Sequence, residues 1–440
     1  MTSRRNILVW LVLSLAISVA WGYSIERSKS VGLVDFRAIY YGARAVLDHQ
    51  DPYQPDEYLA AYRREGGALP TDASQSNVWR AVPICVNLPT TLFLVVPFAL
   101  IGWGPAHLLW MILIPMCLLI AAWLACDLAR DYGGASALIL SCIVLANSEL
   151  LLQLGNGTGI AASLCVAAVW CFWRNKFVWA GILCLSVALA LKPQEVALIW
   201  LYFLLAGTVH RKRALVCLGL VAVFVALSLL WISTVSPHWL QEWHSNVAAT
   251  SVHGDLNDPG PTSIGNMKLG MTVSLQSVLS YIRDDPGFYN LSSYLICLPL
   301  IGLWIVTALR AGLSQRTGWL ALASMSALSM LPVYHRQYDV KLLFLMLPAC
   351  AMLCREGGTV RRYSLLTTAA AILFTSDIPV AMLLLINKAI ALPQNQLSGK
   401  LVSVLLARTP TLVLFASSVF YLWMFAQQVW RDSPVSPDPA

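Results

Sequence analysis

The sequence predicts an all-α polytopic membrane protein, and three observations support this fold class. The chain has 440 residues, of which 58% are hydrophobic and only 12% are charged. Its mean hydropathy is +0.67. Runs of about twenty apolar residues recur along its length, each able to cross the roughly 30 Å core of a bilayer. Because these runs lack the period-two alternation of barrel strands, helices must satisfy their backbone groups in lipid.

The apolar runs predict about twelve membrane-spanning helices. We place them at residues 7–23, 105–129, 136–152, 158–173, 177–191, 195–209, 214–234, 292–310, 317–333, 339–354, 363–386 and 407–429. The first run follows the basic start MTSRR, and we interpret it as a retained signal anchor because many further spans follow. The segment NLPTTLFLVVPFALIG (87–102) is excluded. With roughly fifteen residues and internal prolines, it is expected to be interfacial or re-entrant.

Basic residues then predict the orientation of the chain. If the amino terminus is cytoplasmic and the segment 87–102 does not cross, the basic loops all fall on the cytoplasmic side, as the positive-inside rule requires. These loops lie at Arg130, 174–176, 210–213, 310–316, 355–362 and Arg431. The net charge of +7 is therefore explained by topology, and we expect no nucleic-acid partner.

We interpret residues 1–440 as a single integral membrane domain with both termini in the cytoplasm. Residues 24–104 form the first extracytoplasmic loop, which is expected to hold interfacial helices, and residues 235–290 form the second large one. Shorter segments expected on the same outer face are 153–159, 191–195, 333–339 and 387–406.

The stretch GLVDFRAIYYGARAVLDHQDPY (32–53) gathers many polar residues directly behind the first span. Apolar residues at helical spacing after Asp35 predict an amphipathic helix on the membrane surface, and Pro52 ends it. The Asp35 carboxylate is a solvated loop group, a partner of Arg37, or a general base whose proton affinity is raised by partial desolvation. Asp51 either caps a turn or takes part in function.

Two cations stand at the outer ends of later spans. Lys192, in ALALKPQE, is costly between apolar helices, so it snorkels to the interface, pairs with Glu195 or binds a phosphate. In VYHRQYD (333–339), Arg336 is suited to clamp a phosphate, and Asp339 is its ion-pair partner in the simpler interpretation.

The turn QLGNGTG (153–159) offers Gln153 and Asn156 beside glycines that permit close backbone approach. It either only joins two helices or lets amides reach sugar hydroxyls.

His244 and His253 lack a tight metal spacing, and the eleven cysteines lie almost all in apolar runs, where they are packing residues. We therefore expect no metal site and no disulfide framework. The sequence also lacks nucleotide-binding motifs, so we expect no cofactor and a substrate that arrives in the lipid.

The order of these motifs resembles the GT-C glycosyltransferases, and more narrowly glycosyltransferase family 87, the polyprenyl-phosphate-mannose-dependent α-mannosyltransferase group. The residues that carry the resemblance are VDFRAIYYGARAVL…DPY, the apolar stretch after NLP, QLGNGTG, ALALKPQ and, in the second half, YHRQYDVKLLFLMLPA. The resemblance implies a GT-C-like bundle that takes its sugar from a lipid-linked donor on the extracytoplasmic side, without a nucleotide sugar.

The same resemblance implies roles for particular residues. Asp35 is implied as the catalytic residue. Lys192 and Arg336 are implied to bind the donor phosphate, and we expect His335 to assist them. Further substrate contacts are expected from Asp51, Tyr40, Asn156, Gln153 and Gln194.

These features predict an inverting glycosyltransferase in which Asp35 is the general base. The expected partners are a polyprenyl-phosphate sugar, with mannose implied by the resemblance, a glycolipid or glycan acceptor of the cell envelope, and membrane lipids. The expected location is a bacterial plasma membrane, with the site on the extracytoplasmic face. The alternative is a polytopic transporter or flippase of a lipid-linked or polar envelope substrate, although the sequence shows no matched halves of the kind that transporter repeats produce.

Overall fold

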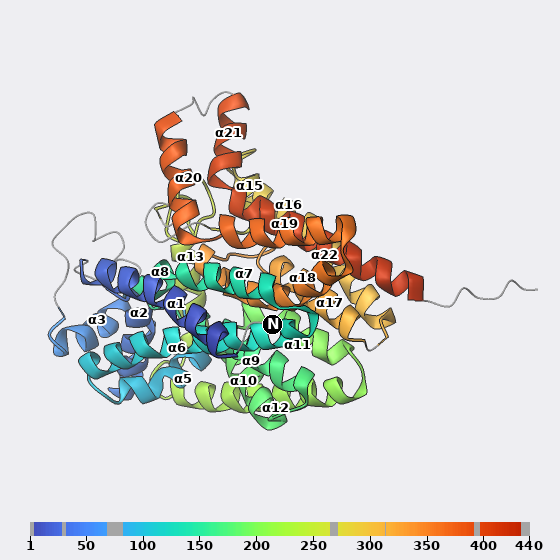
Figure 1. Cartoon of the computed structure of the whole chain (residues 1–440). Coiled ribbons are helices and arrows are strands. Elements are labelled where there is room, and N and C mark those ends of the chain that lie inside the picture. The colour runs from blue at the N-terminus through green and yellow to red at the C-terminus, as the bar shows by residue number, and fades with distance from the viewer. Residues whose placement is uncertain are drawn as a thin grey trace, which may run out of the picture.

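The computed structural model describes residues 4–28, 32–67, 82–264, 272–312, 314–390 and 397–432. In this part of the chain every regular element is a helix, and extended pairing is limited to an isolated bridge between Thr272 and Arg336. The predicted all-α fold class is confirmed (Figure 1). The elements are α1 (Arg4–Arg27), α2 (Val34–Leu47), α3 (Pro55–Arg64), α5 (Pro89–Ala99), α6 (Trp103–Ala129), η1 (Arg130–Tyr132), α7 (Ala135–Ala146), α8 (Glu149–Leu154), α9 (Thr158–Arg174), α10 (Val178–Leu191), α11 (Pro193–Leu205), α12 (Thr208–Ile232), α13 (Trp239–Thr250), α15 (Leu275–Leu279), α16 (Pro286–Arg310), α17 (Gln315–Leu328), η2 (Gln337–Leu345), α18 (Met346–Glu356), α19 (Gly358–Phe374), α20 (Asp377–Ile390), α21 (Leu397–Ala407) and α22 (Thr409–Asp432).

The chain is a multi-pass membrane protein by the length and composition of its helices. In the described residues six helical segments are long and apolar enough to cross a bilayer, or seven if α19 and α20 form one bent span. The six are Arg4–Arg27, Trp103–Tyr132, Val209–Ile232, Pro286–Arg310, Gln337–Glu356 and Thr409–Arg431. Other predicted spans coincide with shorter apolar helices, among them α9, α10 and α11. The total of about twelve spans therefore stays a prediction.

Two predicted spans are interrupted by helix breaks. The span predicted at 136–152 is divided into α7 and α8, and the span predicted at 363–386 is divided into α19 and α20, which are bent by 74°. At the first break the Ser148 hydroxyl donates to a carbonyl of the last turn of α7 at 2.7 Å. At the second, the Ser376 hydroxyl donates to a carbonyl of α19 at 2.6 Å. Such side-chain bonds compete with the helical pattern, which hydropathy alone does not detect.

The segment that we excluded from the predicted spans forms α5, a helix of 11 residues. It begins at Pro89 and contains Pro97. At 1.5 Å per residue its length is about 16 Å, far less than a bilayer core requires. The structure thus places a short helix where the sequence predicts a segment too short to cross.

α2 occupies the predicted helical stretch but differs from the expected surface helix, because most of its residues are buried inside the protein. The Phe36 ring stacks on the indoles of Trp110 and Trp103, with ring centroids 4.3 and 5.5 Å apart. Tyr41 also stacks on Trp103 at 5.5 Å. Aromatic residues at the start of α6 therefore cover the apolar face of α2 that the amphipathic pattern assigns to lipid.

Helices that are distant in the sequence meet in the middle of the bundle (Figure 1). The amino-terminal helices α1 to α6 lie on one side, the carboxyl-terminal helices α16 to α22 lie on the other, and α20 and α21 project together from the rest. Between the two groups, α9 packs against both α10 and η2. This arrangement brings the α8–α9 turn, the α10–α11 turn and the start of η2 close to α2.

Candidate active site

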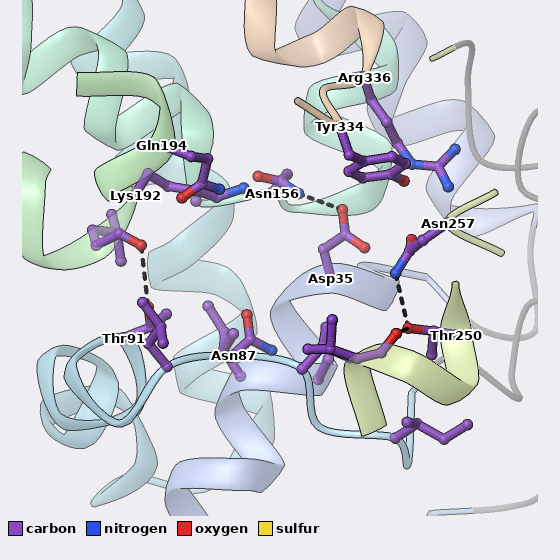
Figure 2. A pocket seen from close by; sticks show the side chains of 18 of the residues that line it. Asp35, Asn87, Thr91, Asn156, Lys192, Gln194, Thr250, Asn257, Tyr334 and Arg336 are labelled. Atoms are coloured by element: carbon purple, nitrogen blue, oxygen red, sulfur yellow. Dashed lines mark hydrogen bonds between the residues drawn. The ribbon is translucent and has the colours of Figure 1, made fainter. Parts of the chain in front are cut away.

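A cavity of about 410 Å³ lies where these turns face α2. Its lining includes five of the residues predicted for the site, namely Asp35, Asn156, Lys192, Gln194 and Arg336. In Figure 2 the Asp35 carboxyl lies between Lys192 on one side and Arg336 on the other. The remaining walls come from the segment that leads into α5 and from α13 with the residues that follow it.

A backbone contact fixes where α2 begins. The N–H of Leu33 donates to the carbonyl oxygen of Gln153 at 3.1 Å. Leu33 itself adopts a left-handed conformation, with a φ of 48°, immediately before the helix. Asp35 follows in the first turn of α2, where the helix dipole favours a negative charge. The start of α2 is therefore attached to the α8–α9 turn, and Asp35 faces that turn.

Gly155 permits the close approach of that turn to α2. Its φ of 66° is left-handed, and a Cβ atom at this position would lie 2.9 Å from Leu33 Cδ2 and 3.1 Å from Phe36 Cβ. Its carbonyl oxygen also accepts a hydrogen bond from Trp110 Nε1 at 2.8 Å. A glycine is needed here for both its conformation and its size, as the sequence predicts for this turn.

Asn156 connects the turn to the Asp35 carboxylate. Its Nδ2 donates to Asp35 Oδ2 at 2.7 Å. Its Oδ1 accepts from the backbone N–H of Thr158 at 2.9 Å and from the Thr158 hydroxyl at 2.7 Å. Because the amide oxygen is engaged by Thr158 at the start of α9, the amide nitrogen has to face Asp35. One carboxylate oxygen is therefore held, and the other faces the cavity.

The environment of Asp35 changes its acidity. Burial raises the pKa of the Asp35 carboxyl, while the hydrogen bond from Asn156 and the charges of Lys192 and Arg336 lower it. Burial dominates, so the pKa lies above the ordinary value of an aspartate. A carboxylate with a raised pKa accepts a proton more readily, which is the property that a general base requires.

Lys192 lies at the break between two helices. It ends α10 and precedes α11, and its φ of −145° with a ψ of 71° is not helical. Pro193 begins α11 and lacks the N–H that would continue α10. The ammonium lies 3.8 Å from a carboxylate oxygen of Glu195, and the side chain also lines the cavity. Lys192 can therefore pair with Glu195 and still face a ligand in the cavity, so these two predicted roles are compatible.

A polar network lies behind the two cations. The Thr158 hydroxyl contacts Glu195 Oε1 at 2.8 Å and Asp339 Oδ1 at 2.7 Å, in addition to Asn156. A hydroxyl carries one hydrogen, so it can donate to only one of these oxygens. Glu195 also forms an ion pair with Lys192. Asp339 also accepts a hydrogen bond from the backbone N–H of Arg336. The network links α9, α11 and η2.

Arg336 lines the cavity from the opposite side. Its backbone N–H donates to Asp339 Oδ2 at 2.6 Å. Its Nη2 donates to the carbonyl oxygen of Leu256 at 2.7 Å, and its guanidinium lies 5.3 Å from the ring centroid of Tyr334. Asp339 therefore orients the Arg336 backbone, in addition to any role as a countercharge. The guanidinium is held between the loop after α13 and Tyr334.

Three other predicted residues lie outside the cavity lining. The Tyr40 hydroxyl donates to the carbonyl oxygen of Ile101 at 2.8 Å, which joins α2 to the segment before α6. His335 is 1% exposed, with Nδ1 3.2 Å from the carbonyl oxygen of Val333. Gln153 contributes its backbone carbonyl to the start of α2. These residues support the walls of the site and do not reach its interior.

Asp51 also lies outside the cavity lining and forms a turn. Its Oδ1 accepts from the Tyr53 N–H at 2.9 Å, which is the capping geometry that a residue before proline favours. Burial raises the pKa of the Asp51 carboxyl to about 6, and its hydrogen bond with Glu242 acts in the same direction. This pair joins the first predicted outer loop to α13.

No pattern in the sequence indicates that α13 contributes to the cavity. Trp243 and Thr250 line the cavity, together with Asn257 from the following loop. The indole of Trp243 donates to the carbonyl oxygen of Val86 at 2.9 Å, so α13 is bonded to the segment before α5. Only the expectation that residues 24–104 and 235–290 share a face could have suggested that they meet.

The described residues contain no group of three or more His, Cys, Asp or Glu side chains that could hold a metal ion. All eleven cysteines are free thiols. The polar groups of the cavity are thus a carboxylate, two cations, amides and hydroxyls, which suit a sugar and a phosphate.

Comparison with known families shows which family the chain belongs to. The family model of glycosyltransferase family 87 matches residues 86–333, which is more than half of the chain. The chain belongs to glycosyltransferase family 87. No curated protein and no solved structure matches it. The matched region contains Asn156 and Lys192, whereas Asp35 and Arg336 lie outside it. The protein is therefore a membrane glycosyltransferase, and its donor and acceptor have to be inferred from the site.

Proposed function

We propose that this family 87 glycosyltransferase transfers a sugar from a polyprenyl-phosphate donor to a hydroxyl of an envelope glycolipid or glycan, with inversion at the anomeric carbon. The observation that carries the proposal is a single cavity whose wall joins Asp35 to the cations Lys192 and Arg336. A carboxylate can remove the acceptor proton, and the two cations can stabilise a departing phosphate. Mannose as the sugar follows from the family resemblance.

In the proposed reaction, the Asp35 carboxylate accepts the proton of the acceptor hydroxyl while that oxygen forms a bond to the anomeric carbon. In the same step the bond between this carbon and the phosphate oxygen breaks, and the electron pair leaves with the polyprenyl phosphate. One displacement converts a β-linked sugar phosphate into an α-linked product, so one base is sufficient. Asn156 orients this base through the 2.7 Å hydrogen bond.

The leaving phosphate is stabilised by Lys192 and Arg336. Lys192 is suited to this role because its ammonium has three donors and its ion pair to Glu195 is long, at 3.8 Å. Arg336 supplies a planar guanidinium on the other side of Asp35. Both cations bind the donor before reaction, and they are more important as negative charge develops on the leaving oxygen.

The donor is proposed to reach the site from the bilayer. Apolar residues of the segment that leads into α5, including Val86 and Leu88, line the cavity beside Asn87, and they provide a wall for the first prenyl units. We place the site on the extracytoplasmic face of a bacterial plasma membrane, because the basic loops lie at the opposite ends of the same helices.

Reconstitution of the full chain tests this proposal. Purified protein in nanodiscs is incubated with radiolabelled polyprenyl-phosphate mannose and extracted envelope lipids, and polyprenyl-phosphate arabinose and a nucleotide-linked mannose are compared as donors. We expect label in a new glycolipid from the lipid-linked mannose only. Transfer from the nucleotide sugar would contradict the proposed donor class, and movement of label across a vesicle without a new bond would favour a flippase.

The cation role is tested by Lys192→Gln. Loss of a charge-assisted contact should raise the KM for the lipid-linked donor roughly tenfold to a hundredfold. The matched control is Lys212→Gln, because Lys212 is an exposed residue near the start of α12 and does not line the cavity. An unchanged KM in Lys192→Gln would remove this residue from the phosphate site without affecting the role of Asp35.

A further inference from the structure

A second cavity, of about 320 Å³, lies at the other end of α9 from the candidate active site. Thr158, which contacts the Asp35 network, begins α9, whereas Arg174 ends it and lines the second cavity. The helix has 17 residues, so the two sites are about 25 Å apart along its axis. The second cavity therefore plays no part in the transfer site.

The lining of this second cavity is strongly basic. Four cations contribute to it, namely Arg4, Arg130, Arg174 and Lys176, and Asp127 is the acid among the described lining residues. Asp127 is already paired with Arg130 at 2.8 Å and with Arg174 at 3.2 Å. Arg4 and Lys176 form none of the ion pairs found in the described part of the chain. The pocket thus has an excess of positive charge that an anion could neutralise.

An apolar stripe leads into the basic pocket along α6. It consists of exposed residues spaced to share one face of the helix, Leu109, Ile112, Met116 and Ile120, which are 49, 45, 54 and 50% exposed. Trp123 and Leu124 lie one turn further along α6 and line the pocket. The pocket is therefore continuous with a surface that suits an acyl chain.

Exposed aromatic residues mark the level of the pocket relative to a bilayer. Phe177 and Trp179, directly after Lys176, are each 74% exposed. Aromatic side chains of this kind gather at the boundary between the hydrocarbon core and water. The pocket therefore lies where lipid headgroups are found, and the positive-inside pattern assigns this end of the bundle to the cytoplasmic leaflet, which is rich in anionic lipids.

We propose that this pocket binds the headgroup of an anionic phospholipid. The phosphodiester lies between Arg4 and Lys176, the cations without an ion-pair partner in the described residues, and the indoles of Trp123 and Trp170 flank it. One acyl chain follows the apolar stripe of α6. The group that the pocket recognises is a phosphate attached to a lipid. This phosphate connects the ends of α1, α6 and α9. The inference is independent of the proposed glycosyl donor.

The experiment measures lipid binding to the purified full chain in detergent. Dioleoyl phosphatidylglycerol and dioleoyl phosphatidylcholine are titrated separately, and bound lipid is counted by native mass spectrometry while the melting temperature is followed. Inorganic phosphate and glycerol 3-phosphate are titrated in parallel to test a soluble source of the same phosphate. The variant is Arg4→Gln/Lys176→Gln, and the control is Lys212→Gln/Arg362→Gln, which removes the same charge from exposed positions outside the pocket.

We expect phosphatidylglycerol, but not phosphatidylcholine, to bind and stabilise the protein. Its affinity should fall roughly fivefold for each pocket charge removed, and the control variant should bind as the wild type does. Equal loss in both variants would overturn the proposal, since it would show attraction to net charge alone. Equal stabilisation by inorganic phosphate or glycerol 3-phosphate would overturn the lipid assignment. If the double variant does not fold, Lys176→Glu is judged by the same criteria.

Discussion

Replacing Asp35 with Asn tests the proposed general base most directly. Asn has nearly the same volume, and its side-chain oxygen can still accept the hydrogen bond that Asn156 donates at 2.7 Å. The position of α2 depends on the backbone bond of Leu33 and on the close contact with Gly155, and neither involves the carboxylate. The substitution therefore removes charge and basicity and should leave the geometry in place.

The expected magnitude follows from these contacts. The transfer rate should fall about 10²- to 10⁴-fold, which is the usual contribution of a positioned general base. The affinity for the donor, in contrast, should not fall. The Asp35 carboxylate interacts electrostatically with Lys192 and Arg336 and so competes with the donor phosphate for them. The donor should therefore bind as tightly as before, or more tightly, in Asp35→Asn.

The pH dependence of the rate gives a second readout of the same group. Burial raises the pKa of Asp35 above its ordinary value, and a general base works only when it is ionised. Wild-type activity should therefore be lost as the pH falls through this raised pKa and be fully present above it. The residual activity of Asp35→Asn should lack this acidic limb.

The assay compares initial rates of label transfer with direct measurements of donor binding. Asp48→Asn is the matched control, because Asp48 ends the same helix and pairs with Arg44 and Arg64 at 3.4 and 2.8 Å without lining the cavity. The base assignment is refuted if Asp35→Asn transfers within about tenfold of this control. A loss of donor binding large enough to explain the whole fall in rate would refute it equally.

Further substitutions test the turn and the outer loop. Gly155→Ala, which places a Cβ in a left-handed and crowded position, should lower the melting temperature and the transfer rate through a cost of about 1–2 kcal/mol or more, whereas Gly157→Ala, with a φ of −64°, should not be strained. Asn156→Ala removes a hydrogen bond that lowers the pKa of Asp35, so the acidic limb of the rate profile should move to higher pH than in the wild type. Because the pKa of Asp51 is raised to about 6, its stabilising contribution is present at low pH and is lost as the pH rises through 6. The wild-type melting temperature should therefore fall more between pH 5 and pH 7 than that of Asp51→Asn.

The sequence predicts the helical bundle well because the signal for a membrane helix is local. A long apolar run is sufficient for α1, α6, α12, α16 and α22, and no knowledge of neighbouring helices is needed. The two divided spans were missed for the same reason. The hydroxyls of Ser148 and Ser376 hardly change the mean hydropathy of a window, yet each bonds a carbonyl in the preceding turn and helps the helix to end.

The residues of the cavity were predictable in part because they interrupt apolar helices. Gly155 and Pro193 end helices for local steric reasons, and the polar residues beside them, Asn156 and Lys192, line the cavity. The contact between Thr158 and Asp339 joins residues 181 positions apart. No local pattern specifies such a contact, so the network behind the cations could not be derived from the sequence.

The residues that were expected in the site but lie outside it show the limit of this reasoning. Tyr40 and Asp51 have the residue types of a sugar-binding site, but each is engaged by nearby backbone, Tyr40 with Ile101 and Asp51 with Tyr53. Asp35 differs because its α-helical position leaves one carboxylate oxygen facing the cavity after Asn156 has bound the other. In an apolar bundle most polar side chains form hydrogen bonds with backbone groups at the breaks between helices. A polar group that keeps an unused oxygen or charge in a shared cavity is therefore a stronger indication of catalysis than its residue type alone.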